Sequence, residues 1–449
     1  MSAADPARLA DKPLTHANIL AIALPIIIAN ITTPLIGIVD TAVLGQLGDP
    51  HYIGAVAVGA MIFNMIYWAF GFLRMGTTGI TAQAEGSGDR DEVAATLIRT
   101  LLIAGSCGIA LILLQGPIAY TAFSLIEGSA PVEAEAATYF TLRIWGAPAA
   151  LANYALLGWF IGRGRTGTAL QLQLLLNGAN VILDALFVLV FEWGVAGVAI
   201  GTLISEVFAA VCGLWLARRM LRHAGAVVTR ERTFDARALK RIVSVNADIM
   251  IRTLCLLFAL SWFTAKSAET NDVILAANAI LLNFAHFAAY FLDGFAFSTE
   301  TLVGQAIGAR RKARFREAIW MSSQWAVVLS VLLGAAFLAF GGLYIDLLTV
   351  NAEVRAAARL FLVWAAISPI VGVWCFLLDG IFVGATRTAD MRNMMIVSLA
   401  VYLLAWLVLT DLYGNHGLWA ALNLFWLVRA ITLASRLPGL QRAAFAGAA

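Results

Sequence analysis

The stretch Gly158-Trp-Phe-Ile-Gly-Arg-Gly-Arg-Thr166 closes one apolar segment of this chain, and a close copy, Gly380-Ile-Phe-Val-Gly-Ala-Thr-Arg-Thr388, closes another 222 residues later. A shared apolar composition does not by itself place Gly, Arg and Thr at matching loop positions. The repeat therefore predicts two halves of the same fold in parallel orientation, an arrangement typical of membrane transporters. Two further pairs of segments echo each other at nearly the same spacing: 57–64 with 276–283, and 83–86 with 305–308.

The composition is that of an integral membrane protein. Hydrophobic residues make up 61% of the 449 and charged residues 13%, against about 25% charged in soluble domains, and the mean hydropathy is +0.85. Apolar segments of about 20 residues, enough to cross a bilayer core as a helix, recur along the chain. We predict an all-α membrane fold of twelve transmembrane helices in two pseudo-symmetric six-helix bundles. The predicted spans are 17–46, 53–82, 93–120, 139–161, 170–192, 195–217, 242–265, 273–303, 318–343, 360–384, 393–412 and 417–434.

The distribution of Lys and Arg predicts the orientation, because cytoplasmic loops carry the excess of these residues. With the N-terminus inside, the inner loops and tails hold 22 of the 30 basic residues. Both termini are therefore expected in the cytoplasm of a bacterial-type inner (plasma) membrane. The net charge of +3 and this topology leave no reason to expect nucleic acid as a partner. The predicted parts are a cytoplasmic tail 1–16, an N-lobe 17–217, a basic linker 218–241, a C-lobe 242–435 and a cytoplasmic tail 436–449.

Two aspartates, Asp40 and Asp184, lie well inside apolar segments, where a carboxylate is costly unless it is partnered, hydrated or protonated. Asn177, Asn180 and Asp184 are spaced i, i+3, i+7, so they share one face of a helix. Thr202, Asp40 and Asp184 each lie six to eight residues from the outer end of their span, a depth of about 9–12 Å. We therefore expect them to meet in one cavity. Tyr139 and Asn153 of span 139–161 are expected at its border.

The polar cluster is predicted for the N-lobe alone. At the repeat spacing, Asp40 corresponds to Trp262 and Asp184 to Trp406, and Thr202 corresponds to Phe425 with one inserted residue. The C-lobe therefore lacks an equivalent set of polar groups at these positions.

Two nearby carboxylates in low dielectric repel each other, so one of them should hold a proton, and such a pair can load and release H⁺. The carboxylates, with Asn180, Thr202 and a backbone carbonyl near Val198, also offer the hard oxygen ligands that Na⁺ would need. A structural hydrogen-bond network without transport duty is the alternative.

Pro25 and Pro34 each remove a helical hydrogen bond and allow a kink in the first span. One hypothesis is that the protonation state of Asp40 biases this bend. Ordinary packing kinks are the alternative.

Several motifs resemble the MATE (multidrug and toxic compound extrusion) family, in particular its DinF-type branch, over essentially the whole chain. They are Val39-Asp-Thr-Ala-Val-Leu-Gly45, Arg74-Met-Gly-Thr-Thr-Gly-Ile-Thr-Ala-Gln83, Asn246-Ala-Asp-Ile-Met-Ile-Arg-Thr-Leu-Cys255 and Gly384-Ala-Thr-Arg-Thr388. The resemblance implies a V-shaped pair of six-helix bundles that exports amphipathic, often cationic drugs or toxins in exchange for H⁺ or Na⁺. It also implies a cation-linked N-lobe site at Asp40, Asn180, Asp184 and Thr202, with Tyr139 nearby.

Other charges in the apolar segments have open interpretations. Asp248 and Arg252 are spaced i, i+4 and are expected to form a structural ion pair. Asp293, Glu300 and Asp379 do not align with the acidic C-lobe cation site of the NorM-type branch. They either pair with buried arginines or give a substrate cavity negative potential. Met61, Phe63 and Met65 are the side chains we expect to line that cavity.

The leading interpretation is a secondary-active multidrug antiporter that acts as a monomer and needs no cofactor beyond its coupling ion. The sequence contains no Gly-x4-Gly-Lys-[Ser/Thr] motif for ATP. The alternative is a lipid or polysaccharide-precursor flippase, which arginines lining the cavity would favour. An enzyme is disfavoured because catalytic and metal-binding spacings are lacking. A channel is disfavoured because the polar cluster belongs to one lobe, whereas a selectivity filter needs a ring of ligands.

Overall fold

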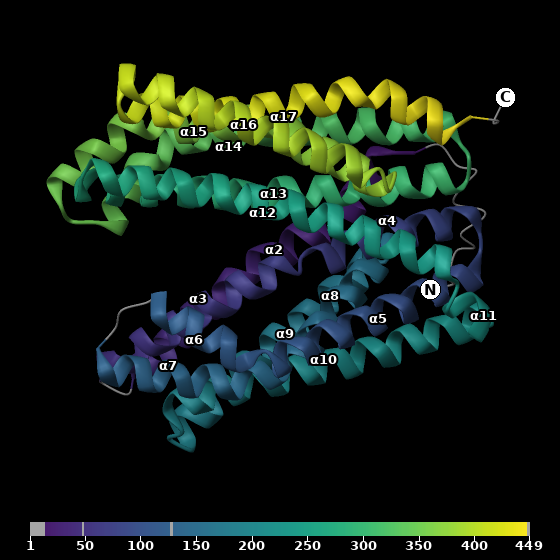
Figure 1. Cartoon of the computed structure of the whole chain (residues 1–449), viewed down its shortest axis with the longest axis horizontal. Helices are drawn as coiled ribbons and strands as arrows, with labels where there is room; N and C mark the ends of the chain where they lie inside the picture. The colour runs from purple at the N-terminus through teal and green to yellow at the C-terminus, as the bar shows by residue number, and fades with distance from the viewer. Residues whose placement is uncertain (1–13, 47–48, 126–128, 447–449) are drawn as a thin grey trace. The chain divides into compact units, whose positions relative to one another are not determined.

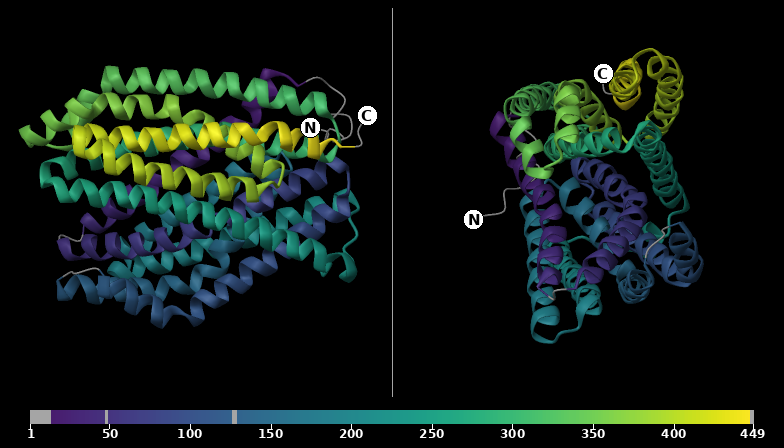
Figure 2. Two further views of the ribbon diagram at one scale, coloured as in Figure 1. Left: turned by 45° about the horizontal axis from the view of Figure 1, so that its top comes forward. Right: turned by 90° about the vertical axis from the view of Figure 1, so that its left-hand side faces the viewer.

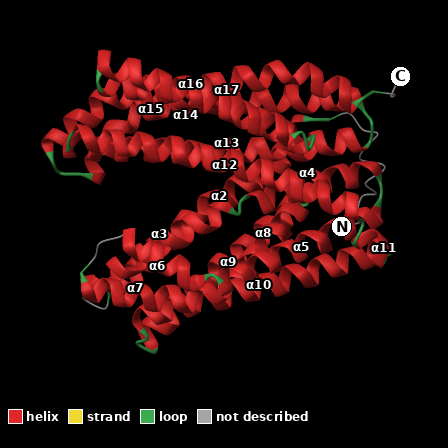
Figure 3. Ribbon diagram, viewed as in Figure 1, coloured by secondary structure: helices red, strands yellow, loops and turns green. Residues whose placement is uncertain are grey.

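The computed structural model describes residues 14–46, 49–125 and 129–446, which form helices joined by short turns, without a strand in these ranges (Figure 3). Figure 1 labels most of these helices along the chain. The helices are α2 (His16–Gly45), α3 (Pro50–Ala69), α4 (Phe72–Ser87), α5 (Arg90–Leu113), α6 (Gln115–Leu125), α7 (Ala130–Arg143), η1 (Ile144–Gly146), α8 (Ala147–Gly162), α9 (Thr166–Ala185), η2 (Leu186–Val190), α10 (Gly194–Ala224), α11 (Arg230–Thr233), α12 (Ala236–Thr270), α13 (Asp272–Gly308), α14 (Lys312–Leu348), α15 (Ala352–Gly384), α16 (Thr388–Tyr413) and α17 (Asn415–Ala444).

The predicted all-α membrane fold is confirmed. Within the described residues, eleven helical segments are long and apolar enough to cross a membrane, with α3–α4 and α7–α8 each counting as one. Helix α2 precedes them and contributes the apolar segment His16–Thr32. These twelve segments correspond one to one with the predicted spans. The short helix α6 is the main departure, since it is separate from α5, whereas the prediction ran the third span on to residue 120.

The described chain groups into two compact units. One comprises Ile28–Glu85 and Asp89–Val243, and we call it the N-unit. The other comprises the described residues of Met1–Ile27, Gly86–Gly88 and Ser244–Ala449, and we call it the C-unit. The first turns of α2 belong to the C-unit because Gly294 of α13 has no side chain, and a Cβ there would collide with Ile27. The cytoplasmic placement of the tails and linker stays a prediction.

The sequence repeat has a counterpart in the packing of each unit. In the N-unit, Gly158 of α8 lies directly against the backbone carbonyl of Arg74 in α4. In the C-unit, Gly380 of α15 lies in the same way against the carbonyl of Ala296 in α13. Both residues of the second contact are 222 positions after those of the first. The repeated glycines are therefore places where two helices approach too closely for any side chain.

The turns that follow these glycines also match. Gly164 has φ +70° and its counterpart Thr386 has φ +53°. A left-handed conformation is routine for glycine but strained for a β-branched residue. The turn geometry is thus the same in both units even where the residue that suits it best has been replaced.

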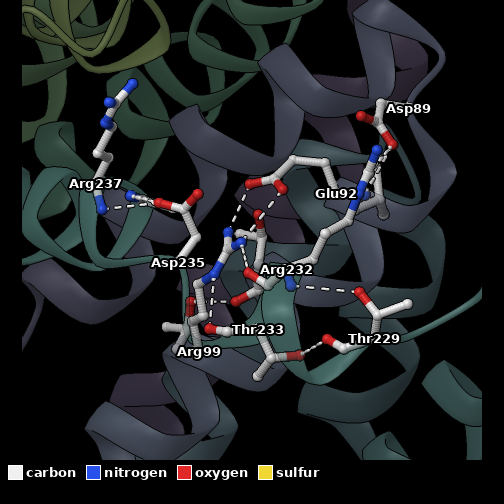
Figure 4. Close-up of polar contacts among 12 residues, drawn as sticks. Asp89, Glu92, Arg99, Thr229, Arg232, Thr233, Asp235 and Arg237 are labelled. Atoms are coloured by element: carbon white, nitrogen blue, oxygen red, sulfur yellow. Dashed lines mark hydrogen bonds and ion pairs between the residues drawn. The ribbon is translucent and has the colours of Figure 1, made fainter.

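The linker between the two repeats is held by a buried arginine, in a group that we call the linker clamp: Glu92, Arg99, Arg232 and Thr233 (Figure 4). Arg99 of α5 is 1% exposed. Its Nε donates to the Thr233 carbonyl at 3.1 Å, another nitrogen donates to the Arg232 carbonyl, and a third pairs with Glu92 Oε1 at 2.6 Å. One guanidinium therefore satisfies the carbonyl groups at the end of α11 and a carboxylate of α5.

Asp89, just before α5, adds an outer contact to the same linker. Its Oδ1 accepts from the Glu92 backbone N–H at 3.0 Å and from Arg232 at 2.7 Å. Partial burial acts to raise the pKa of the Asp89 carboxyl, but these bonds and the Arg232 charge outweigh it and hold that pKa below its ordinary value. The carboxylate is therefore charged at neutral pH.

Replacing Arg99 by Met should lower the thermal unfolding midpoint of the purified protein. The change leaves Glu92 and two carbonyl groups without their partner, and removing one member of a buried pair costs about 3 kcal/mol or more. Arg230→Met, an exposed arginine of α11, is the matched control and should leave the midpoint unchanged. Equal midpoints for the two variants would show that the clamp does not stabilise the protein.

Candidate functional site

The predicted polar face of α9 is buried in the N-unit. Asn180 and Asp184 are 1% and 0% exposed, and Asn177 is buried with them, whereas Ile182 on the opposite face is 67% exposed. The i, i+3, i+7 spacing puts the three polar residues in line, and the apolar face of α9 is the one left open. One residue after Asp184, the α-helix ends and continues as the π-helical turn η2, a feature often found at functional sites.

Asp40 of α2 meets Asp184 of α9. Both are buried, and their carboxyl groups lie within hydrogen-bonding reach of each other. Among the described residues, no N–H or O–H group forms a well-oriented bond with Asp40 Oδ1 or with either oxygen of Asp184. A hydrogen bond between two carboxyl groups requires a proton on one of them. We call these two residues the carboxyl pair.

Helix α10 forms a wall of the carboxyl pair at a glycine. A Cβ on Gly201 would collide with Asp184 Oδ1, so the absence of a side chain is what gives that carboxyl its space. The next residue, Thr202, donates its hydroxyl to the Val198 carbonyl at 2.9 Å and accepts from Asn180 Nδ2 at 3.1 Å. Asn180 Oδ1 is buried and unpaired. Carboxyl, amide, hydroxyl and carbonyl oxygens therefore come together here, and all are hard ligands.

Helix α2 is tied to α9 by a second contact, because Asn177 Nδ2 donates to Thr32 Oγ1 at 3.0 Å. Pro25 and Pro34 both lie within α2, but the side chain of Pro34 is outside the described set. The hypothesis that they let α2 bend with the protonation of Asp40 therefore stays a prediction.

A buried arginine that the sequence gave no reason to single out lies beside the pair. Arg143, at the end of α7, donates to the Tyr139 hydroxyl at 2.6 Å, and its guanidinium lies 4.7 Å from the centre of the Phe63 ring. Glu206 Oε1 is 3.9 Å from Arg143. The available signal was the charge of Arg143 inside a span, one turn after Tyr139.

Asn153 lies on the Glu206 side of this cluster. Its Nδ2 donates to the backbone carbonyl of Glu206 at 2.9 Å, and Gly146 leaves space for the Glu206 carboxyl. Asn153 and Tyr139 thus both contact the Arg143–Glu206 pair. The structure brings together every residue predicted for the coupling site, while their role stays a prediction.

The three residues expected to line a substrate cavity do not share a surface. Met61 and Met65 are 44% and 63% exposed, but Phe63 is fully buried between them in sequence. The side chain of Phe63 packs on Phe140 and Tyr139. Two residues along a helix turn a side chain by more than half a circle, which separates Phe63 from the methionines.

The predicted ion pair between Asp248 and Arg252 is wrong. Asp248 bonds to Arg392 at 2.5 Å and to the Thr388 hydroxyl at 3.0 Å, both from α16. Arg252 pairs with Asp379 of α15. Each side chain of α12 therefore takes a partner from a neighbouring helix, where a fully buried geometry is available, instead of its neighbour one turn away.

The acidic residues of the C-unit are not alike. Asp379 is buried between Arg252 and Arg429 and pairs with both. Glu300 is 1% exposed and Asp293 is half-buried, both on α13. Pairing with arginine, one of the two outcomes expected from the sequence, is what Asp379 shows.

At the C-unit positions equivalent to the carboxyl pair, the two tryptophans are in contact. The rings of Trp262 and Trp406 meet edge to face with centres 5.0 Å apart. The Lys266 ammonium lies 4.8 and 4.9 Å from these ring centres, a cation–π arrangement. The same place in the two repeats therefore holds two carboxyl groups in one unit and an aromatic pair with its own cation in the other.

A fold of two repeated helical units with a buried carboxyl pair defines a polytopic membrane transporter. The family model MatE matches residues 25–186 and 249–408. The chain is 39% identical to the DNA damage-inducible protein F of Escherichia coli, over 95% of this chain and 91% of that protein. It therefore belongs to the MatE family, and it is a transporter rather than an enzyme.

More distant comparisons agree with this assignment. The chain is 25% identical to a probable multidrug resistance protein NorM of Caulobacter vibrioides, over 71% of this chain and 68% of that protein. Its fold is similar to that of the Vibrio cholerae MATE transporter VcmN in the bent form, with a TM-score of 0.84 and 20% identity. That match covers 96% of this chain and 97% of the other.

A double-mutant cycle on Arg143→Met and Glu206→Gln should show coupling. Removing Arg143 strands the Glu206 charge, so the second change should restore part of the stability lost in the first, with a coupling of about 0.5–3 kcal/mol. Thermal unfolding midpoints of the purified variants measure this. Asp411→Asn, an exposed change in the C-unit, should be additive with Arg143→Met. Additivity for Glu206→Gln as well would contradict a functional Arg143–Glu206 pair.

Proposed function

We propose that this protein is a secondary-active multidrug efflux antiporter that exchanges amphipathic, often cationic compounds for H⁺ or Na⁺ by alternating access. The observation that carries the proposal is the carboxyl pair. Among the described residues, no Lys, Arg or His lies within 4.0 Å of the carboxyl oxygens of Asp40 or Asp184, whereas the buried Asp379 and Asp248 have such partners. Buried carboxyl groups without a basic partner are the groups whose charge an arriving ion can change.

Protonation supplies the coupling in its simplest form. With one proton the pair carries a single negative charge and a carboxyl–carboxyl hydrogen bond. Loss of that proton leaves two carboxylates in contact, which is unfavourable in low dielectric. The deprotonated state therefore favours a conformation that separates or hydrates the two groups, and reprotonation favours their return. Tyr139, Asn153 and Asn177 hold the surrounding helices and side chains in register.

Sodium binding is the second form of the same proposal. The oxygens of Asp40, Asp184, Asn180 and Thr202, with the Val198 carbonyl, would hold the ion and compensate the paired charges. The unpaired Asn180 Oδ1 supports this ligand set. A sodium ion has to fit between carboxyl groups that are in contact in this structure, whereas a proton does not.

The names of the relatives support a small-molecule substrate. One bears the name of a probable multidrug resistance protein. We place the protein as a monomer in a bacterial-type plasma membrane with both termini in the cytoplasm, from the distribution of Lys and Arg.

A flippase for phosphate-bearing lipids or polysaccharide precursors is the second candidate. The observation that favours it is the cluster in which Arg252 and Arg429 share Asp379. Two guanidinium groups on one carboxylate leave positive charge that a phosphate could use.

The central test is export of a fluorescent lipophilic cation by proteoliposomes with an imposed pH or Na⁺ gradient. Asp40→Asn and Asp184→Asn should each reduce gradient-driven flux to the level of protein-free vesicles, because the variant pair can no longer change its charge as required. Asp411→Asn is the matched control and should transport like the wild type. Full coupled flux in Asp40→Asn would overturn the proposed role of the pair.

The same vesicles separate the alternatives. Flux driven by a pH gradient without Na⁺ identifies H⁺ as the coupling ion, and flux only with a Na⁺ gradient identifies Na⁺. Translocation of a phosphate-bearing lipid, together with no export of any cation tested, would replace the antiporter by the flippase.

Gly201→Ala should impair coupling without unfolding the protein. The added methyl group pushes against the Asp184 carboxyl, and overpacking of this kind costs about 1–3 kcal/mol. We expect slower gradient-driven export than in the wild type at a similar expression level. Gly178→Ala is the matched control, since a Cβ there meets no atom within 4 Å and Ala favours a helix. Equal impairment in both variants would show that helix composition, and not contact with Asp184, is responsible.

A further inference from the structure

A basic pocket lies at one end of α16 and α17, which pack together in the C-unit (Figure 2). The cavity measures about 220 Å³. Arg387 and Asp390 line it from the start of α16, and the end of α17 supplies the remaining residues. These are Ser435, Arg436, Pro438, Gly439 and Arg442. All lie far along the chain from the carboxyl pair, which belongs to the other unit.

The pocket has surplus positive charge. Arg387 pairs with Asp390 at 3.1 Å, which balances one of the three arginines. Arg442 makes one long bond, at 3.4 Å, to the Pro438 carbonyl. In the described chain, no acidic side chain lies within salt-bridge distance of Arg436 or Arg442. Two guanidinium groups therefore face a cavity without a protein anion to balance them.

An exposed apolar stripe leads along α17 to this pocket. Leu427 and Ile431 are 44% and 59% exposed, and Ser435 and Gly439 of the pocket follow at the same four-residue interval. Side chains four residues apart lie above one another on a helix. From Leu427 to Ser435 the distance along the axis is about 12 Å. The stripe is long enough to contact the upper part of an acyl chain.

Helix α16 continues this apolar surface on the other side. Val397 and Leu404 are 43% and 64% exposed and follow Asp390 at seven-residue intervals, which also keeps them on one face. The pocket is thus charged at its base and bordered by exposed apolar side chains on both helices. A free anion would use only the charged part of this surface.

We infer that this pocket binds the phosphate group of an anionic phospholipid, with the acyl chains along the apolar stripe. The planar guanidinium of Arg matches phosphate oxygens with two parallel hydrogen bonds. The N-terminus of α16, where Arg387 lies, adds the positive end of a helix dipole. Arg387, Arg436 and Arg442 are all on the side that the sequence assigns to the cytoplasm, where basic pockets bind anionic headgroups.

The test is native mass spectrometry of the delipidated full-length protein, titrated with phosphatidylglycerol in detergent. Wild type should bind one lipid preferentially, and Arg436→Gln/Arg442→Gln should need at least about tenfold more lipid for the same occupancy. Arg230→Gln/Arg237→Gln removes the same charge from the exposed linker and should bind like the wild type. Zwitterionic phosphatidylcholine should not show the preferred adduct.

Further arms keep the inference falsifiable. If the double variant does not purify as a folded protein, Arg436→Gln alone is used, because this exposed side chain has no ion-pair partner to lose, and it should still weaken binding several-fold. Equal loss in the linker control would mean that net charge alone attracts the lipid. Displacement of the lipid by millimolar inorganic phosphate would assign the pocket to a soluble anion. Either result would overturn the lipid site.

Discussion

The constraint on which the rest of the structure depends is that a charge removed from water needs a partner. The chain meets it with inter-helical contacts nearly everywhere that a charge is buried. Arg99 satisfies two carbonyl groups and a carboxylate, Asp248 takes Arg392 and Thr388, and Asp379 takes two arginines. Each of these contacts stabilises one packing of helices. The carboxyl pair is the departure from the pattern, since its oxygens face each other.

The internal repeat shows how one scaffold can hold different chemistry in its two copies. The glycine contacts and turns recur 222 residues apart, so the backbone framework is the shared part. Within it, one copy contains Asp40 and Asp184 and the other contains Trp262 and Trp406. An aromatic pair occupied by Lys266 is electrically complete, whereas two carboxyl groups depend on an ion from outside. Coupling under the proposed mechanism is therefore confined to the N-unit.

The sequence predicted what depends on one helix at a time. Hydropathy located the twelve spans, and the i, i+3, i+7 spacing placed Asn177, Asn180 and Asp184 on one buried face. What it could not predict depends on how helices are rotated against each other. The pairing of Asp248 with Arg392 rather than Arg252, the position of Arg143 beside Glu206, and the separation of Phe63 from Met61 and Met65 all arise from that rotation. The basic pocket of α16 and α17 likewise joins residues about fifty positions apart.

Helix α10 links the two polar groups of the N-unit. Val198, Gly201 and Thr202 face the carboxyl pair and Asn180, and Glu206, one turn further, faces Arg143. Because Gly201 leaves no slack beside Asp184, separation of the two carboxyl groups requires α2, α9 or α10 to move. A shift of α10 would also change the 3.9 Å gap between Arg143 and Glu206. Loss of a proton from the pair therefore has a direct mechanical route to a second charged contact, and through Arg143 to Tyr139 and α7.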